Sequence, residues 1–405
     1  MTPGSPGEGR GRDGLRLSNA CIVDVRRGEI REGSVTIRSG RIVEESEDEP
    51  HGSADVDIGG AYVVPGLINC HTHLSIVFPF SEWDEHESPA TTALRCSRRG
   101  FDALRAGVTT VRTVSEMHRA DIALRSMIEN GWVRGPRIFS GGCGIGVTGG
   151  HGAGFGVLIA DGADAFRRQA RRELAAGADH LKIFLTGGIA HRNELFQAPQ
   201  MTREEIAAVV AVARSRSTYV TAHAGGGRAL TEALEEGLGC CEHGYHLDDA
   251  NIQRMVEHRC ALVPTLSVTR SPGWMKDHRF ADWTIDRSLE AAPDHLASAR
   301  RAAAAGVQLL VGTDLPPGDT DQGVNVTVRE IEHLVDAGLS PLEALRGATL
   351  YPARLLSAED RVGVLEPGHF GDLLVLASNP LEDVRALREV RMVVQGGCIV
   401  RRERI

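Results

Sequence analysis

Short apolar strand patterns alternate with longer helical patterns from about residue 61 to residue 358, and this alternation constrains the fold most strongly. Eight stretches have strand character: 62–70, 109–113, 137–140, 180–185, 219–222, 239–242, 261–266 and 309–313. Amphipathic stretches such as 163–176, 228–236 and 325–337 separate them. Such alternation is typical of a parallel sheet covered by crossover helices. Eight units predict an α/β fold, a (β/α)8 TIM barrel over residues 61–359, with its chemistry at the C-terminal ends of the strands.

The expected helices carry recognisable end signals. Thr202 and Glu205 have the spacing of a capping box, in which each side chain bonds the backbone N–H of the other residue. Glycines follow several helical patterns directly ahead of the next strand, for example Gly177 and Gly237. Glycine tolerates the left-handed conformation that commonly ends a helix. These signals support the strand–helix alternation.

Both ends of the chain show short strand patterns without helical patterns between them. Short strands separated by turns are expected within 14–60, and strand patterns return at 372–376 and 390–400. We therefore expect a small β-sandwich domain built from residues 14–60 together with 360–405. Residues 1–13 are polar and glycine-rich, and we expect them to form a disordered leader.

Composition excludes several classes of protein. Charged residues make up 24% of the chain and the net charge is −9, which gives no bias towards polyanions such as nucleic acid. No apolar run reaches the roughly 18 residues of a membrane span, and the start of the chain has no hydrophobic signal core. The eight cysteines show no Cys-x-x-Cys spacing, so we expect buried free thiols. A cytoplasmic protein that acts on a small molecule, not on nucleic acid or a membrane, fits best.

Lysine usage is unusual. Of 45 basic residues only Lys182 and Lys276 are lysines. Lys182 lies within the apolar strand pattern at 180–185, where a charged amine is costly to bury. A lysine kept in such a place indicates chemistry that a guanidinium group cannot perform.

Polar residues fall at the predicted strand ends. His71 and His73 lie two residues apart on an extended strand, so both imidazoles face the same side and can reach one metal ion. Lys182 lies in the fourth strand, and His223, His243 and Asp314 end the fifth, sixth and eighth strands. Four histidines and an aspartate suit one or two divalent ions, zinc most naturally. A neutral Lys182 amine could add carbon dioxide and form a carbamate that bridges two metals.

Motifs spread over nearly the whole chain carry a family resemblance. They are PGLINCHTH (65–73), AGVTTVR (106–112), LKI (181–183), AHA (222–224), CEHG (241–244), GTD (312–314), and PG (367–368) followed by GDL (371–373). The chain resembles the amidohydrolase superfamily, in particular the binuclear, carboxylated-lysine branch that includes imidazolonepropionase-like enzymes and prolidase-type dipeptidases.

The resemblance implies a metal centre and a reaction. It places one ion on His71, His73, carboxylated Lys182 and Asp314, and a second on Lys182, His223 and His243. A metal-bridging hydroxide would attack an amide carbonyl, in an N-acyl amino acid, a dipeptide or a cyclic amide. Asp314 would take the proton and pass it to the leaving nitrogen, so that an acid and an amine are released.

Three residues are candidates for substrate binding. His151 lies near the end of a loop, 141–154, that holds eight glycines. The resemblance to dipeptidases implies that this histidine lies near the substrate. Arg192, which follows the fourth strand, could pair with a substrate carboxylate or lie in solvent, and Tyr245 follows the sixth strand. Many dipeptidase-like members have a tyrosine where this chain has Gly225, and usually an aspartate at the position of Thr113. The glycine removes a carboxylate anchor and is expected to open the pocket.

Alternative functions remain in the same superfamily and outside it. A mononuclear deaminase is disfavoured because Gly226 stands where such enzymes use a glutamate. A lactone or ester hydrolase would use the same metals on a different bond. A non-catalytic homologue usually lacks ligands that are all present here. The oligomeric state stays open, a homo-oligomer included.

Overall fold

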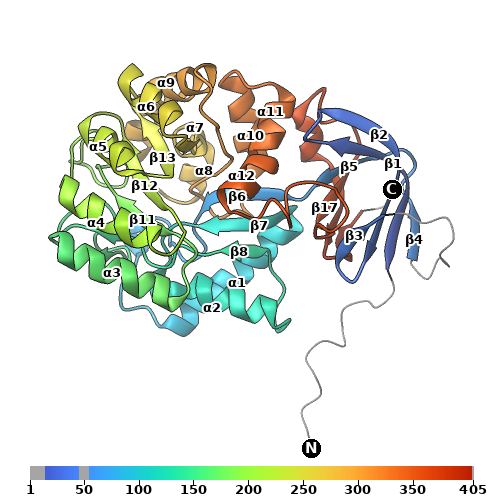
Figure 1. The fold of residues 1–405 in the computed structure, drawn as a ribbon, viewed down its shortest axis with the longest axis horizontal. Coiled ribbons are helices and arrows are strands. Elements are labelled where there is room, and N and C mark those ends of the chain that lie inside the picture. The colour runs from blue at the N-terminus through green and yellow to red at the C-terminus, as the bar shows by residue number, and fades with distance from the viewer. Residues whose placement is uncertain (1–13, 45–53, 404–405) are drawn as a thin grey trace, which may run out of the picture.

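The computed structural model describes residues 14–44 and 54–403. The leader expected at 1–13 lies outside these residues. The described chain has two parts: a sheet of strands from both ends of the chain, at the right of Figure 1, and a larger region in which helices surround parallel strands.

The terminal sheet joins the first and last segments of the chain. Its order is β19-β18-β17-β5-β1-β2-β3, with β4 paired to β1. The strands are β1 (Leu15–Asp24), β2 (Glu29–Arg38), β3 (Arg41–Val43), β4 (Ala54–Asp57), β5 (Tyr62–Pro65), β17 (Leu373–Leu376), β18 (Val390–Gln395) and β19 (Cys398–Arg402). One face packs into its own apolar cluster, which includes Leu17, Ile37, Leu373 and Val394. The strands predicted at both ends therefore pair with each other.

The strand predicted at 62–70 is in fact two strands. β5 pairs with β1 and β17 in the terminal sheet, whereas β6 (Leu67–Thr72) pairs with β7 in the central region. Gly66 separates them, and a side chain there would collide with Thr109. The sequence shows the Pro65–Gly66 break inside 62–70, but the prediction of a single strand was wrong because the sequence pattern does not show that the two halves have different partners.

The central strands all pair in parallel. The strands β6, β7 (Val108–Thr113) and β8 (Arg137–Phe139) form one sheet, and another has the order β10-β9-β11-β12-β13-β14. Its members are β9 (Ile145–Gly146), β10 (Leu158–Ile159), β11 (Leu181–Phe184), β12 (Val220–Gly225), β13 (Cys240–Tyr245) and β14 (Ala261–Val263).

Residues 309–313, the predicted eighth strand, connect the two sheets. Leu309 forms a parallel bridge with Leu262 in β14, and Cys70 N–H in β6 donates to the Val311 carbonyl. On the other side, Asp179 N–H ahead of β11 donates to the carbonyl of Ser140 after β8. Backbone hydrogen bonds thus link successive parallel strands from β6 back to β6.

Helices lie outside these strands (Figure 1). They are α1 (Pro89–Arg105), α2 (Ala120–Glu129), α3 (Ala163–Ala176), α4 (Arg203–Arg214), α5 (Arg228–Glu236), α6 (Asp249–Glu257), α7 (Ser267–Arg270), α8 (Pro272–Asp277), α9 (Asp282–Ala304), α10 (Val326–Asp336), α11 (Pro341–Gly347) and α12 (Leu350–Leu355). Shorter elements are η1 (Phe80–Glu82), η2 (Met117–Arg119), η3 (Val384–Arg388), β15 (Thr320–Asp321) and β16 (Val324–Asn325).

The end signals of the helices are confirmed. Thr202 and Glu205 form the capping box at the start of α4, with N–H···O distances of 2.8 and 3.3 Å. Gly177 and Gly237 adopt the left-handed conformation after α3 and α5, with φ of 107° and 104°. Local chemistry therefore sets where these helices begin and end.

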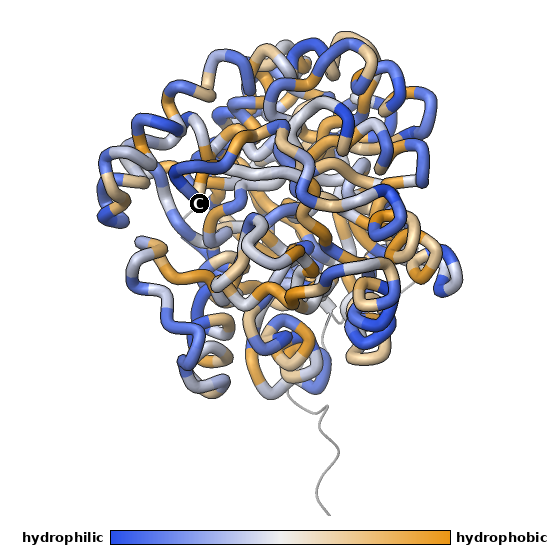
Figure 2. Tube along the Cα trace, turned by 90° about the vertical axis from the view of Figure 1, so that its left-hand side faces the viewer, coloured by the Kyte–Doolittle hydropathy of each residue, from blue (hydrophilic) through white to orange (hydrophobic). Residues whose placement is uncertain are grey.

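The largest apolar cluster joins the two parts. It runs from Phe166 and Ile183 in the central region to Leu374 and Val393 in the terminal sheet. Figure 2 shows hydrophobic segments within the molecule and hydrophilic segments mainly at its edge. All eight cysteines are free, as expected, and six of them are buried.

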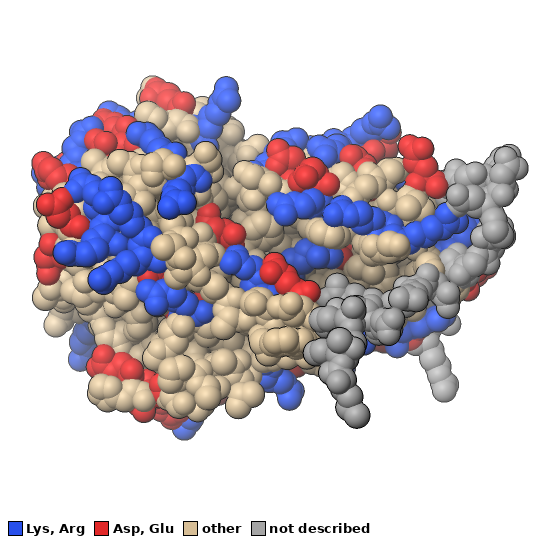
Figure 3. Space-filling view, turned by 60° about the horizontal axis from the view of Figure 1, so that its bottom comes forward, with Lys and Arg blue, Asp and Glu red and all other residues tan. Residues whose placement is uncertain are grey.

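The surface is mixed in charge. On the face drawn in Figure 3, basic side chains lie beside acidic ones at the left and along the upper part, and much of the rest is uncharged. Within the described residues, none of the helices is both long enough and apolar enough to cross a membrane.

Candidate metal centre

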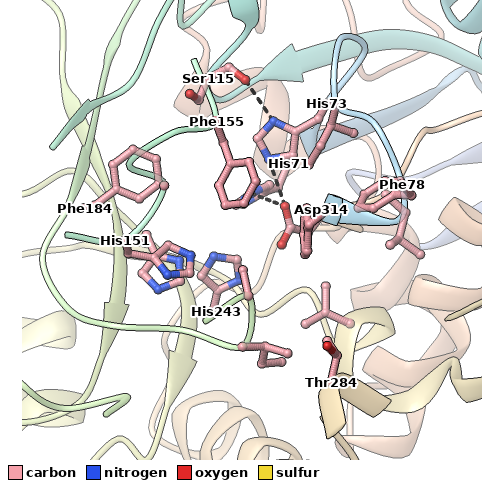
Figure 4. Close-up of a pocket in the computed structure, with 18 of the residues that line it drawn as sticks. His71, His73, Phe78, Ser115, His151, Phe155, Phe184, His243, Thr284 and Asp314 are labelled. Carbon is pink, nitrogen blue, oxygen red and sulfur yellow. Dashed lines mark hydrogen bonds and ion pairs between the residues drawn. The ribbon is translucent and has the colours of Figure 1, made fainter. Parts of the chain in front are cut away.

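His71, His73 and Asp314 converge where β6 ends. Oδ1 of Asp314 lies 3.1 Å from Nε2 of His71 and 2.9 Å from Nε2 of His73 (Figure 4). Each residue offers a ligand atom within 4.8 Å of the others. The backbone fixes this approach, because the N–H groups of Thr313 and Asp314 both donate to the His71 carbonyl. Two segments about 240 residues apart in sequence are thus held at one point.

The other three predicted ligands line the same pocket. Lys182, His223 and His243 come from the adjacent strands β11, β12 and β13. The ring centroids of His223 and His243 are 4.5 Å apart, and that of His243 is 4.9 Å from His71. All six side chains predicted as ligands therefore face one cavity, close to the ends of parallel strands.

Lys182 is buried beneath the histidines. Its side chain is 2% exposed, and burial lowers its pKa to about 8, against the opposing effect of the Glu242 and Asp314 carboxylates. Its Nζ lies 5.3 Å from the centre of the Phe184 ring. At neutral pH an amine with a pKa of about 8 has a far larger uncharged fraction than an ordinary lysine, and the uncharged form is the one that reacts with carbon dioxide.

Hydrogen bonds orient the histidine rings. Nδ1 of His73 lies 3.0 Å from the Ser115 carbonyl, and Nδ1 of His243 lies 2.7 Å from Oγ1 of Thr265. These contacts leave Nε2 of both rings available to a metal ion. The His223 ring has the opposite orientation. Its Nε2 lies 3.1 Å from the Gly187 carbonyl, so its Nδ1 is the nitrogen available to a metal ion. Ring orientation by such contacts is usual for metal-binding histidines.

A buried ion pair supports His71 from behind. Nδ1 of His71 lies 2.6 Å from Oε2 of Glu242, and Nη2 of Arg112 donates to Oε1 at 2.5 Å. Glu242 and Arg112 are fully buried. Burial alone would raise the pKa of Glu242, but Arg112 and His71 outweigh it and hold the pKa well below its usual range. The carboxylate is therefore charged.

Sequence reasoning gave no role to Glu242 or Arg112. A signal for them existed, because each places a charge within an apolar strand, and two opposite charges buried in one core predict a pair. The strand pattern could not show that Glu242 lies against His71.

The predicted substrate-binding residues have different placements. His151 lines the pocket, stacks on His223 at 4.1 Å between centroids, and has Nδ1 2.5 Å from Oε2 of Glu194. Tyr245 also lines the pocket and stacks on His243 at 5.4 Å. Glu194, which the sequence did not single out, holds the His151 ring in place.

Arg192 is an exception. Its side chain is exposed, does not line the pocket, and lies over the Trp283 ring at 5.2 Å. Among the three predicted binding residues, Arg192 is therefore the one that the structure does not bring to the cavity, and a role in binding a carboxylate there stays a prediction.

The space at Gly225 is filled, not open as expected. A side chain at Gly225 would collide with the carbonyl oxygen of Phe196, whose ring packs 4.8 Å from Tyr245. The segment after β11 thus occupies the position where a tyrosine would project. This close backbone approach requires a glycine, and the glycine does not enlarge the pocket.

The donor set fits divalent metal ions. Four imidazoles, one carboxylate and one amine able to become a carbamate are N and O ligands of the kind that zinc binds. The His71, His73 and Asp314 atoms already approach one another as ligands of one ion do.

Comparisons with known proteins agree with this arrangement. The model of the amidohydrolase family matches residues 62–400, and the chain belongs to this family. Ochratoxinase of Aspergillus niger is 27% identical over 82% of this chain and 73% of its own. Imidazolonepropionase of Streptomyces coelicolor is 25% identical over 86% of each.

Solved structures are similar over nearly the whole chain. A prolidase in complex with N-methylphosphonate-L-proline has a TM-score of 0.86 and 30% identity, covering 96% of this chain and 100% of that one. The family resemblance expected from the sequence is confirmed, and the family and its named relatives support a hydrolase that acts on amide bonds of a small-molecule substrate.

Proposed function

We propose that this protein is a binuclear metal-dependent hydrolase that cleaves an amide C–N bond. The observation that carries the proposal is the convergence of six metal-binding side chains on one pocket, at or near the C-terminal ends of parallel strands. The linked strands support a closed (β/α)8 barrel over residues 61–359, at whose C-terminal face such sites lie. Residues 14–60 and 360–405 would form the accompanying β-sandwich domain.

The six side chains would hold two ions. His71, His73 and Asp314 would bind one, His223 and His243 the other, and carboxylated Lys182 would bridge them. Zinc suits these ligands best. Bound ions would supply Lewis acidity, which lowers the pKa of water and polarises the scissile carbonyl.

The chain's own residues would then direct the proton. Asp314 accepts the proton that water releases as its oxygen bonds to the carbonyl carbon. It gives this proton to the nitrogen as the C–N bond breaks, so that an acid and an amine leave. His151, held by Glu194, and Tyr245 flank the pocket and would orient the substrate. Linear amides, dipeptides and cyclic amides are all compatible with these steps.

A deaminase that uses a glutamate at position 226 does not fit. A side chain at Gly226 would collide with the His246 carbonyl, so the backbone leaves no room for that glutamate. Esters and lactones remain the alternative class of bond, because the same metals and the same base would serve them.

Lys182 provides the sharpest test. We expect about two divalent ions per chain and amide hydrolysis in the native protein. Lys182→Ala should lose bound metal and turnover, and added propionate should restore part of both by supplying the missing carboxylate. Lys182→Arg should not be rescued, because its side chain fills the space.

The exposed lysine is a matched control. Lys276→Ala should keep both metals and full turnover, since Lys276 lies on the surface. Two ions and normal hydrolysis in Lys182→Ala would overturn the bridging role. Activity on esters or lactones alone, in a screen that includes N-acyl amino acids, dipeptides and lactams, would overturn the bond assignment.

A further inference from the structure

The outer half of the metal pocket is built from aromatic rings. Three segments contribute them: the chain after β6, the glycine-rich loop before β10, and the chain around α8. The rings that line the pocket here are Phe78, Phe80, Trp83, Phe155, Trp274 and Phe280. None of these rings was predicted from the sequence, because they lie in loops and short helices outside the strand and helix patterns.

These rings form one connected wall centred on Phe78. The Phe78 ring lies 5.0 Å from Trp274, 5.2 Å from Phe280 and 5.3 Å from Phe80, between centroids. Phe80 lies 5.2 Å from Phe155, which closes the other side. Separations of this size are typical of favourable aromatic packing, so the wall is preformed.

An ion pair ties two of these segments together. Nη2 of Arg279 lies 2.7 Å from Oε1 of Glu82, joining η1 to the chain after α8. Oδ2 of Asp319 accepts from the Trp274 indole at 3.1 Å, which fixes that ring. A fixed wall has little conformational entropy left to lose when a ligand binds.

The pocket has no fixed cation for a carboxylate. Among the described residues that line it, there is no arginine, and Lys182 lies at the metal end. The nearby Arg287 does not line the pocket; its Nη1 and Nη2 donate to the carbonyls of Arg192, Gly188 and Glu194, and only its buried Nε has no partner. His151 already faces the Glu194 carboxylate. A free carboxylate at the aromatic end would therefore be desolvated without a partner.

A cationic ligand is also disfavoured at this wall. His278 stacks on the outer face of Trp274 at 4.0 Å, and its pKa is raised by Asp319, 3.3 Å away. The His278 ring thus covers one face of Trp274, on which a cationic ligand could otherwise stack.

We propose that the substrate carries a neutral aromatic group on one side of the scissile amide, and that the wall around Phe78 binds it. This inference rests on the proposed amide hydrolysis and narrows its substrate class to neutral aryl amides. Free dipeptides and N-acyl amino acids, which carry a carboxylate, then become poor substrates.

Two measurements separate this inference from the proposed function. The first is calorimetric binding of N-(2-naphthyl)methanesulfonamide, which cannot be hydrolysed as an amide, to the metal-loaded protein. We expect it to bind at least about 10-fold tighter than N-cyclohexylmethanesulfonamide, because the planar ring packs on the wall. The second is kcat/KM for neutral N-aryl and N-aroyl amides against N-acyl amino acids and amides with a quaternary ammonium group.

Variants assign the binding to the wall. Phe78→Leu keeps an apolar side chain, and it should remove most of the preference for the naphthyl ligand while metal content stays unchanged. Trp132→Ala is the control, because Trp132 is 66% exposed and lies outside the pocket lining. Circular dichroism of both variants checks that they fold.

The outcomes distinguish the two ideas. Selective naphthyl binding without hydrolysis of any amide would support the aromatic site and overturn the proposed function. Hydrolysis that prefers carboxylate-bearing or cationic amides, or equal binding of naphthyl and cyclohexyl ligands, would overturn the aromatic site and leave the proposed function standing.

Discussion

Asp314 is the residue on which the proposed reaction depends most directly. Its carboxylate approaches two histidines, and although burial opposes ionisation, His71 and His73 hold its pKa well below the usual range. In Asp314→Asn the amide can still contribute an oxygen ligand but cannot accept a proton. We expect kcat to fall by about 10³-fold or more while much of the metal is retained.

Steady-state kinetics and metal analysis on the same sample check this prediction. Asp164→Asn is the control, because its side chain is 94% exposed and lies on α3. Turnover near the native value in the Asp314 variant would remove Asp314 from the role of base.

Glu242 gives a second prediction at this scale. Glu242→Gln keeps the shape but leaves the Arg112 guanidinium buried without its counter-charge and weakens the contact to His71. We expect a loss of about 3–5 kcal/mol in the free energy of unfolding. We also expect metal affinity to fall by about 10- to 100-fold.

A double variant separates the two effects. Glu242→Gln with Arg112→Met removes the unpaired charge, so stability should recover while metal affinity stays low. Denaturant unfolding and competition with a chelator measure the two quantities. Native metal affinity in the double variant would show that Glu242 acts only through the fold.

At the scale of elements, the sequence predicted the parallel strands and the residues near their ends. Each strand is an apolar run bounded by helical patterns, and polar residues after such runs, as at His73 and Asp314, are visible without a structure. The sequence did not show that β5 and β6 pair in different sheets, because the pattern of one segment does not identify its pairing partners. The Glu242–Arg112 pair, the Phe196 segment against Gly225 and the wall around Phe78 depend on contacts between distant segments, which periodicity does not reveal.

Helix α10 contains a histidine that should make folding sensitive to acid. Burial, with Arg270 and Arg329 nearby, lowers the pKa of His333 to about 3. Nε of Arg270 donates to its Nδ1 at 3.2 Å. Below the unfolded pKa of about 6.5 the unfolded chain gains a proton that the folded chain does not, so stability falls as pH decreases.

His333→Gln keeps an acceptor for Arg270 and does not titrate. We expect the native protein to lose about 2–3 kcal/mol more than this variant between pH 7.5 and about pH 4.5, measured as urea unfolding at both values. His86→Gln, at an exposed position, should follow the native curve. Parallel curves for His333→Gln and the native protein would contradict the assignment.

At the scale of the whole molecule, polar contacts add to the apolar core in fastening the terminal sheet to the central region. Arg137 of β8 forms two hydrogen bonds with Asp372, at 2.6 and 3.0 Å, and its guanidinium lies 3.5 Å from the centre of the Phe370 ring. Asp372 also accepts from Gly396 N–H at 2.8 Å. The buried Asp372 carboxylate is therefore one of the contacts that hold the first and last strands, blue and red in Figure 1, against the central region.

Asp372→Ala should weaken this attachment without touching the metal site. The change leaves Arg137 and the Gly396 N–H without their acceptor, and because Arg137 is partly exposed we expect a loss of about 2–3 kcal/mol in the free energy of unfolding. Asp372→Asn should lose less, since its amide oxygen can still accept. Asp360→Ala, at a side chain that is 77% exposed, should change stability by less than about 0.5 kcal/mol. Urea unfolding of the three variants, with metal content measured below the transition, gives the comparison. Equal midpoints for Asp372→Ala and Asp360→Ala would show that the contacts of Asp372 do not fasten the two parts.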